Sequence, residues 1–194
     1  MKHASILAVF LASSLVLSAG AVDKIEDFLG LKFGSRRPLA KETLLARGSK
    51  LKDEKTPDML TFTDGTYAGE KITELALHFV GDYFDAATVT IKFSTNKSAE
   101  RGLGLYDTIR KALTEKYGAP TTAPSIARGK NFAEKAKGNQ LETIWQSKDT
   151  LTGEYHSITL RVPEMGMYDW VFKVIYQDHN VKQTQKEAAP RKDI

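Results

Sequence analysis

The longest regular pattern of apolar positions along the chain lies in segment 98–120. Four apolar residues there are spaced three, three and four positions apart and so share one face of a helix: Leu103, Tyr106, Ile109 and Leu113. Gly118 can adopt the left-handed conformation that ends a helix, and Pro120 cannot continue one. The pattern therefore predicts one long amphipathic helix with a buried apolar face.

Segments on both sides of this helix alternate between apolar and polar residues, which is the pattern of strands with one buried face. The expected strands are two short ones at 28–34 and 59–63 and longer ones at 71–80, 87–94, 141–148, 154–162 and 168–178. A first, shorter helix is predicted at 35–48, where Pro38 suits the first turn and Gly48 the end. The polar segment 49–58 predicts a loop.

The two halves of the chain share one plan, a helix that ends in glycine followed by three antiparallel strands. We expect a single α+β domain at 22–180, built as a tandem αβββ repeat with units at about 28–95 and 98–178. Side by side, the units would form one antiparallel sheet with two helices packed on one face. The other face of that sheet would stay open.

Residues 1–21 have the three parts of a secretory signal peptide: basic Lys2, an apolar run at 6–17 and small residues at 19–21. A buried N-terminal helix is the alternative. The run is shorter than the ~20 residues that cross a membrane, so we expect a mature chain without a transmembrane segment, periplasmic or secreted. Segment 181–194 has no apolar period and is predicted to be a disordered tail.

Charge and cysteine content narrow the classes of partner. The formal net charge is only +4, and the basic residues are not interleaved with aromatic ones, so we expect no nucleic-acid partner. The chain has no cysteine, which excludes a disulfide framework, a thiolate site and a lipid-attachment cysteine.

Several short segments resemble exported bacterial proteins: Phe33-Gly34-Ser35, LTEKYGAP at 113–120, Trp145 and 174–178. With the repeat, they resemble the tandem αβββ fold of the β-lactamase-inhibitor-protein-like family over about 28–178. One unit at a time, they also resemble the small αβββ lipoproteins of outer-membrane assembly. The resemblance implies protein binding through an uncovered sheet face and hairpin tips. Those inhibitors are usually disulfide-bonded and those lipoproteins carry a lipidated cysteine, so no functional residue of either family can be placed here.

No catalytic or metal-binding constellation is visible in the sequence. His78, His156 and His179 lack the spacing of metal ligands, and Gly102-Leu103-Gly104 lies inside the predicted helix rather than in a phosphate-binding loop. Two carboxylates at the predicted hairpin tip 81–85 fit a solvated turn better than a calcium site. We therefore expect a non-enzymatic protein with no cofactor and no metal; a secreted hydrolase is the alternative from another class.

A binding surface is the better hypothesis. If Ile144 faces the core, Trp145 faces outward, because neighbours in a strand point to opposite sides. The candidate partner-binding residues are Trp145, Tyr155, Arg161, Lys92 and His78 on the open face, with Tyr83 and Phe84 at the hairpin tip. A register shift of one residue would instead bury Trp145, and Tyr83 or Phe84 could fold back over the sheet edge.

The sequence thus predicts an exported, non-enzymatic envelope protein. It would bind another envelope or secreted protein through the open sheet face and the hairpin tips. The alternative is a periplasmic carrier of a small ligand or a cell-wall fragment.

Overall fold

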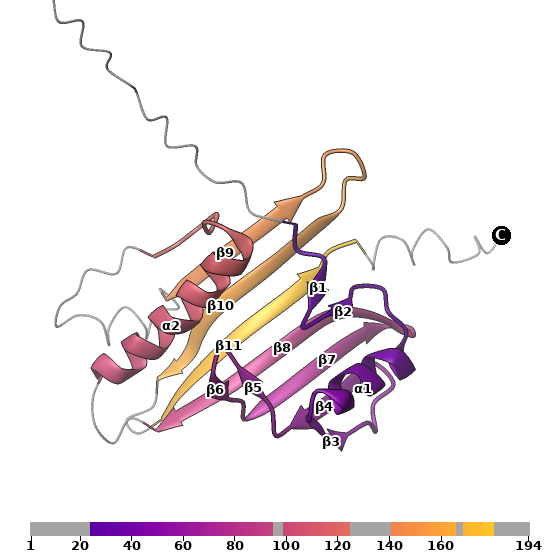
Figure 1. Ribbon diagram of the computed structural model, residues 1–194, viewed down its shortest axis with the longest axis horizontal. Coiled ribbons are helices and arrows are strands. Elements are labelled where there is room, and N and C mark those ends of the chain that lie inside the picture. The colour runs from indigo at the N-terminus through magenta and orange to yellow at the C-terminus, as the bar shows by residue number, and fades with distance from the viewer. Residues whose placement is uncertain (1–23, 95–98, 125–140, 166–168, 181–194) are drawn as a thin grey trace, which may run out of the picture.

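The computed structural model describes residues 24–94, 99–124, 141–165 and 169–180, and in these ranges it forms one antiparallel sheet of seven strands (Figure 1). The strand order is β3-β4-β7-β8-β11-β10-β9, so the two halves of the chain meet where β8 pairs with β11. The strands of this sheet are β3 (Lys50–Asp53), β4 (Met59–Thr63), β7 (Glu74–Val80), β8 (Tyr83–Ser94), β9 (Glu142–Lys148), β10 (Tyr155–Met165) and β11 (Asp169–Asp178).

Two helices and two small hairpins complete the described part of the chain. They are α1 (Arg37–Ala46), α2 (Ala99–Tyr117), the hairpin of β1 (Asp27–Phe28) with β2 (Leu31–Lys32), and the hairpin of β5 (Thr66–Tyr67) with β6 (Glu70–Lys71). Pro38 lies in the first turn of α1, and Gly48 and Gly118 follow the two helices with φ values of 85° and 79°. The helices predicted at 35–48 and 98–120 are confirmed, with slightly shorter bounds.

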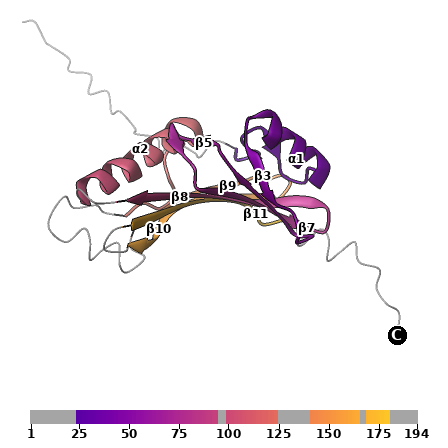
Figure 2. The same cartoon turned by 90° about the horizontal axis from the view of Figure 1, so that it is seen from below.

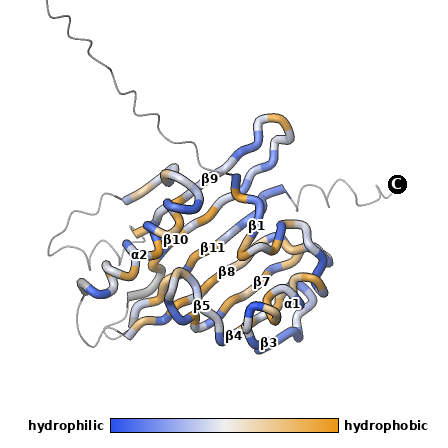
Figure 3. Tube along the Cα trace, in the orientation of Figure 1, coloured by the Kyte–Doolittle hydropathy of each residue, from blue (hydrophilic) through white to orange (hydrophobic). Residues whose placement is uncertain are grey.

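Hydrophobic and hydrophilic residues alternate along the strands (Figure 3), and the alternation gives the sheet one buried and one partly exposed face. In β11, Phe172, Val174 and Tyr176 are buried, whereas the intervening Lys173 and Ile175 are partly exposed. The buried side chains of the strands join those of the helices and hairpins in a single apolar cluster. Burial of this cluster is the main force that holds the fold together.

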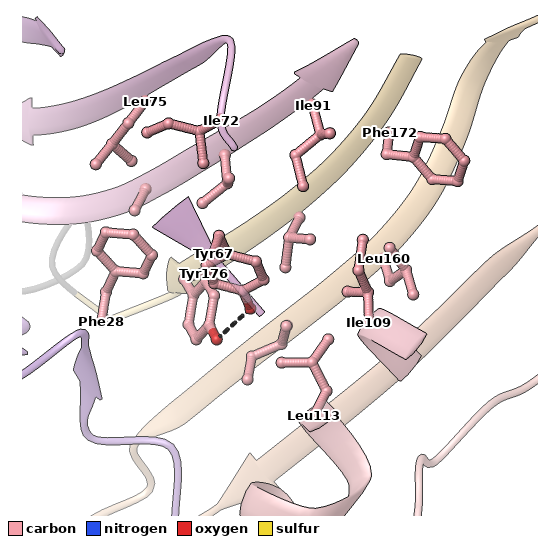
Figure 4. Packing of buried hydrophobic residues seen from close by; sticks show 14 of the residues in the cluster. Phe28, Tyr67, Ile72, Leu75, Ile91, Ile109, Leu113, Leu160, Phe172 and Tyr176 are labelled. Atoms are coloured by element: carbon pink, nitrogen blue, oxygen red, sulfur yellow. Dashed lines mark hydrogen bonds between the residues drawn. The ribbon is translucent and has the colours of Figure 1, made fainter. Parts of the chain in front are cut away.

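A mixed layer covers the apolar face of the sheet: α1, the β1–β2 hairpin, the β5–β6 hairpin and α2 (Figure 2). Leu44 of α1 and Ile109 of α2 are both fully buried in the shared core. Between the helices, Tyr67 of β5 reaches Tyr176 of β11, and their hydroxyl oxygens are 2.8 Å apart (Figure 4). Burial raises the pKa of both phenols.

The predicted fold class, an α+β tandem αβββ repeat with two helices packed on one sheet face, is wrong. The fold is mostly β, with 48% strand, a seven-stranded sheet and additional small sheets. The first half supplies four strands to the main sheet instead of three, because β3 lies within the segment 49–58 that was expected to be a loop. The layer over the apolar face contains the two small hairpins as well as helices.

Both omissions have a physical cause. β3 is an edge strand whose side chains are mostly exposed, so it has no apolar alternation to detect. The strands of the small hairpins have two residues each, which is too short for any period to appear. The single strand predicted at 28–34 is therefore wrong, because the chain turns at Leu29 and Gly30 to form the β1–β2 hairpin.

Some predictions fall outside the described residues. These are the signal peptide at 1–21, the tail at 181–194 and most of the long connection at 119–139. Within the described ranges, neither helix is long and apolar enough to span a membrane.

Candidate functional site

The candidate site is the face of the seven-stranded sheet opposite the mixed layer, called the open face from here on. Its centre is a row of small and β-branched side chains. The strand registers place six of them side by side from β4 to β9: Thr61, Ala76, Thr88, Ile175, Thr159 and Ile144. Such side chains pack well on a pleated sheet, so the row forms a flat, weakly apolar surface.

Three cationic residues gather beside this row: Lys92 of β8, Lys173 of β11 and Arg161 of β10. We call them the cationic patch. Arg161 pairs directly with Lys173, and Lys173 pairs with Thr90, two residues from Lys92 on the same face. Because neighbouring strands lie about 4.8 Å apart, the patch spans only about 10 Å across the sheet. Like charges directly opposite in a sheet are destabilising, and Glu142, opposite Arg161 on its other side, offsets part of this repulsion.

One acidic residue lies directly beside the patch: Glu142 of β9 pairs with Arg161 on the same face. None of the three residues forms an ion pair with another described residue. Glu74, which lies on the same face, is held by Lys52 at 2.7 Å. The Nε atom of Arg161 is buried without a hydrogen-bond partner among the described residues, which costs about 1–3 kcal/mol.

The open face carries four of the predicted partner-binding residues, but not as one site. Lys92 and Arg161 belong to the cationic patch. His78 lies toward the other end of the strands, opposite Ala86, and Tyr155 lies beyond it on β10, opposite Lys148. The structure therefore divides these residues between the two ends of the face.

The predicted orientation of Trp145 is wrong. Its side chain is 0% exposed on the covered face, and its Nε1–H donates a hydrogen bond to the carbonyl oxygen of Gly118 at 3.1 Å. Ile144 is the partly exposed neighbour, so the alternation of β9 runs one residue out of phase with the prediction. The alternative prediction, that a register shift of one residue buries Trp145, is confirmed.

The hairpin tip does not present an aromatic pair. Phe84 is fully buried and stacks on Phe33 with ring centroids 5.4 Å apart, so its predicted role at an exposed tip is wrong. Tyr83 is 40% exposed, and the guanidinium of Arg36 lies 5.8 Å from its ring centroid. Tyr83 is the residue of the pair that remains accessible.

Sequence reasoning missed Lys173 as a site residue. The sequence does predict that Lys173 points outward from the strand at 168–178, because its neighbours Phe172 and Val174 are apolar and point inward. Its proximity to Arg161 and Lys92 depends on the pairing of β8, β11 and β10, which strand periodicity does not specify.

A second cluster of polar residues joins the end of β11 to the start of β10. Ser157 Oγ lies 2.8 Å from His179 Nε2, and His156 Nε2 lies 3.6 Å from Asp178 Oδ1. Residues 156 and 157 alternate in one strand, so their side chains leave the sheet on opposite faces. The two pairs therefore do not combine into a serine–histidine–acid triad.

Metal-binding chemistry has no visible support in the described ranges. Within them, His, Cys, Asp and Glu side chains form no group of three that could hold a metal ion. The absence of a cofactor remains a prediction from the sequence.

Comparison of the chain with protein-family models, with curated proteins and with solved structures found no match. The resemblance to the β-lactamase-inhibitor-protein-like family therefore remains a prediction.

Proposed function

We propose that this protein binds an acidic protein partner through the cationic patch and the adjoining row of the open face. The observation that carries the proposal is the group of Arg161, Lys173 and Lys92, whose charges have no ion-pair partner among the described residues. A partner with carboxylates at matching positions would relieve their mutual repulsion.

The composition of the open face favours a protein over other anionic partners. The patch borders the partly exposed Ile175, so apolar contact is available beside the charges, as in protein interfaces. The aromatic residue Tyr155 lies at the far end of the face, away from the cations, whereas a single-stranded nucleic acid would need aromatic platforms among them.

The alternative is a carrier that would use the other end of the same face. A hollow of about 400 Å³ lies there beside Lys148, Tyr155 and His179, away from the cationic patch. We further propose that the binding is non-catalytic and occurs in the cell envelope, on the basis of the signal-like pattern at 1–21.

Photo-crosslinking from the open face tests the proposal. A crosslinking amino acid at Thr159 should trap a protein in envelope extract of the source cells, and one at Glu70, exposed on the β5–β6 hairpin of the covered side, should not. Mass spectrometry would identify the trapped protein, and we expect acidic residues at its crosslinked surface.

Charge reversal then tests the patch itself. Lys173→Glu places a carboxylate directly opposite Arg161, a pairing that stabilises a sheet, so loss of binding could not be attributed to unfolding. We expect the crosslink to disappear in Lys173→Glu and to weaken with rising salt. The matched control is Lys71→Glu, an exposed lysine on β6, which should retain it. An unchanged crosslink in Lys173→Glu would overturn the proposal.

A further inference from the structure

The side of α1 that is turned away from the sheet carries an apolar patch. Leu39 and Leu45 are 54% and 43% exposed, and they are two of the four large hydrophobic side chains exposed in the described ranges. Pro38 and Ala46 are also exposed, and each lies seven residues, or two helical turns, from one of the leucines. The four residues therefore share one side of the helix, and we call them the α1 patch. A surface helix usually has polar residues on this side, so folding does not account for the patch.

The other sides of α1 hold the helix in place. Ala40 and Leu44 are fully buried in the core on the covered side of the sheet (Figure 2). On one flank, the guanidinium of Arg37 donates hydrogen bonds to the carbonyl oxygens of Thr56 and Met59, each at 3.1 Å. The α1 patch is therefore a preformed surface, and a partner would not have to order it on binding.

One acidic residue lies in the middle of the α1 patch. Glu42 is exposed, three residues from Leu39 and three from Leu45, and it forms no ion pair with any residue in the described ranges. The neighbouring Lys41 is held by Glu54 at 2.6 Å. Covering the patch would take Glu42 out of water, which is favourable only if the partner places a cation against it.

The two ends of α1 carry the opposite charge. Arg36 precedes the helix and Arg47 follows it, and both are exposed. Within the part of the chain that the structure describes, neither forms an ion pair; the guanidinium of Arg36 lies 5.8 Å from the ring centroid of Tyr83. The α1 patch is thus complementary to a surface with a basic centre and acidic margins.

A second copy of this chain does not supply that pattern. Closed dimers use the same surface on both subunits, related by a two-fold axis. Such an axis through the middle of the α1 patch would place Glu42 against Glu42 of the other copy, and like charges in contact disfavour the pairing. The occupant that the charges favour is therefore a different protein.

We propose that the α1 patch is a docking site for a second protein, whose matching surface has a lysine or arginine surrounded by apolar residues. The ten residues of α1 span about 15 Å, so the contact is small and the complex should be weak and reversible. The proposal does not rest on the proposed function, because α1 lies on the covered side of the sheet and the cationic patch lies on the open face.

Photo-crosslinking from the α1 patch tests the proposal on the whole chain. A crosslinking amino acid at Leu39 should trap a protein in envelope extract of the source cells. Mass spectrometry of the crosslinked peptide should show a lysine or arginine among apolar residues. Glu42→Lys should reduce this crosslink at least about tenfold, because two cations would then meet. The control is Glu115→Lys, at an exposed glutamate of α2, which should leave the crosslink unchanged.

A charge exchange completes the test. Replacing the basic residue of the trapped protein by glutamate should restore the crosslink to Glu42→Lys. Leu45→Ser, which removes an exposed apolar contact, should weaken the crosslink as well and serves if Glu42→Lys does not fold. Lys173→Glu should leave the Leu39 crosslink intact, which separates this site from the cationic patch. The proposal is overturned if Leu39 traps nothing, if it traps only a second copy of this chain, or if the crosslink persists in Glu42→Lys.

Discussion

Trp145 and Ile144 are neighbours in β9 with opposite surroundings. The indole is fully enclosed beneath the end of α2 and hydrogen-bonded to Gly118, whereas Ile144 is partly exposed on the open face. At the scale of a residue, the face on which a side chain lies determines whether it contributes to stability or remains available for binding.

Trp145→Ala should therefore lower the free energy of unfolding by about 3–5 kcal/mol, because a large buried side chain leaves a cavity. Ile144→Ala on the adjacent position should cost much less, since part of its surface is already in water. Urea unfolding of the two variants measures the difference. Equal losses would show that Trp145 does not lie in the core.

Helix α2 illustrates how an element combines a pattern readable in the sequence with a contact that is not. Its glycines 102 and 104 look equivalent in the sequence, and both lower helix propensity. In the structure, a Cβ on Gly102 would lie 2.4 Å from Trp170 ring carbons, whereas a Cβ on Gly104 would meet nothing within 4 Å. Gly102 is needed for the close approach of the helix to β11.

The two glycines should therefore respond in opposite directions to the same substitution. Gly104→Ala is expected to raise the free energy of unfolding by about 0.5–1 kcal/mol through helix propensity. Gly102→Ala is expected to lower it, because the methyl group forces α2 away from Trp170. Thermal unfolding of the pair measures both effects, and stabilisation by Gly102→Ala would contradict the packing described here.

At the scale of the whole molecule, buried phenols link folding to alkaline pH. Burial raises the pKa of Tyr106 to about 12 and raises the pKa of Tyr67 and Tyr176 as well. Tyr106 comes from α2, Tyr67 from β5 and Tyr176 from β11, so the effect reports on the joint packing of the mixed layer and the sheet.

The sign of the pH dependence follows from the raised pKa values. Above about pH 10 the unfolded chain loses phenolic protons that the folded chain keeps, so stability is complete below that pH and declines above it. Each such tyrosine contributes a slope of about 1.4 kcal/mol per pH unit. Urea unfolding between pH 9 and about pH 12 should show a shallower decline in Tyr106→Phe than in the natural chain. The control is Tyr83→Phe, at an exposed tyrosine, and its stability should decline as steeply with pH as that of the natural chain. A decline in Tyr106→Phe as steep as in the natural chain would contradict the prediction.

The sequence alone determined the elements whose apolar residues repeat regularly: α2, α1 and the strands of the main sheet other than β3. In these segments the spacing of apolar residues along the chain shows which side chains are buried, and this spacing can be read from neighbouring positions alone. The prediction could not extend to β3 or to the two-residue strands, where no period exists.

Only the tertiary structure decided the phase of β9 and the cationic patch. Both depend on which strands pair and in which register: Arg161 meets Lys173 through the pairing of β10 with β11. Contacts between residues far apart in the chain leave no local period, because they arise from the burial of all the elements together.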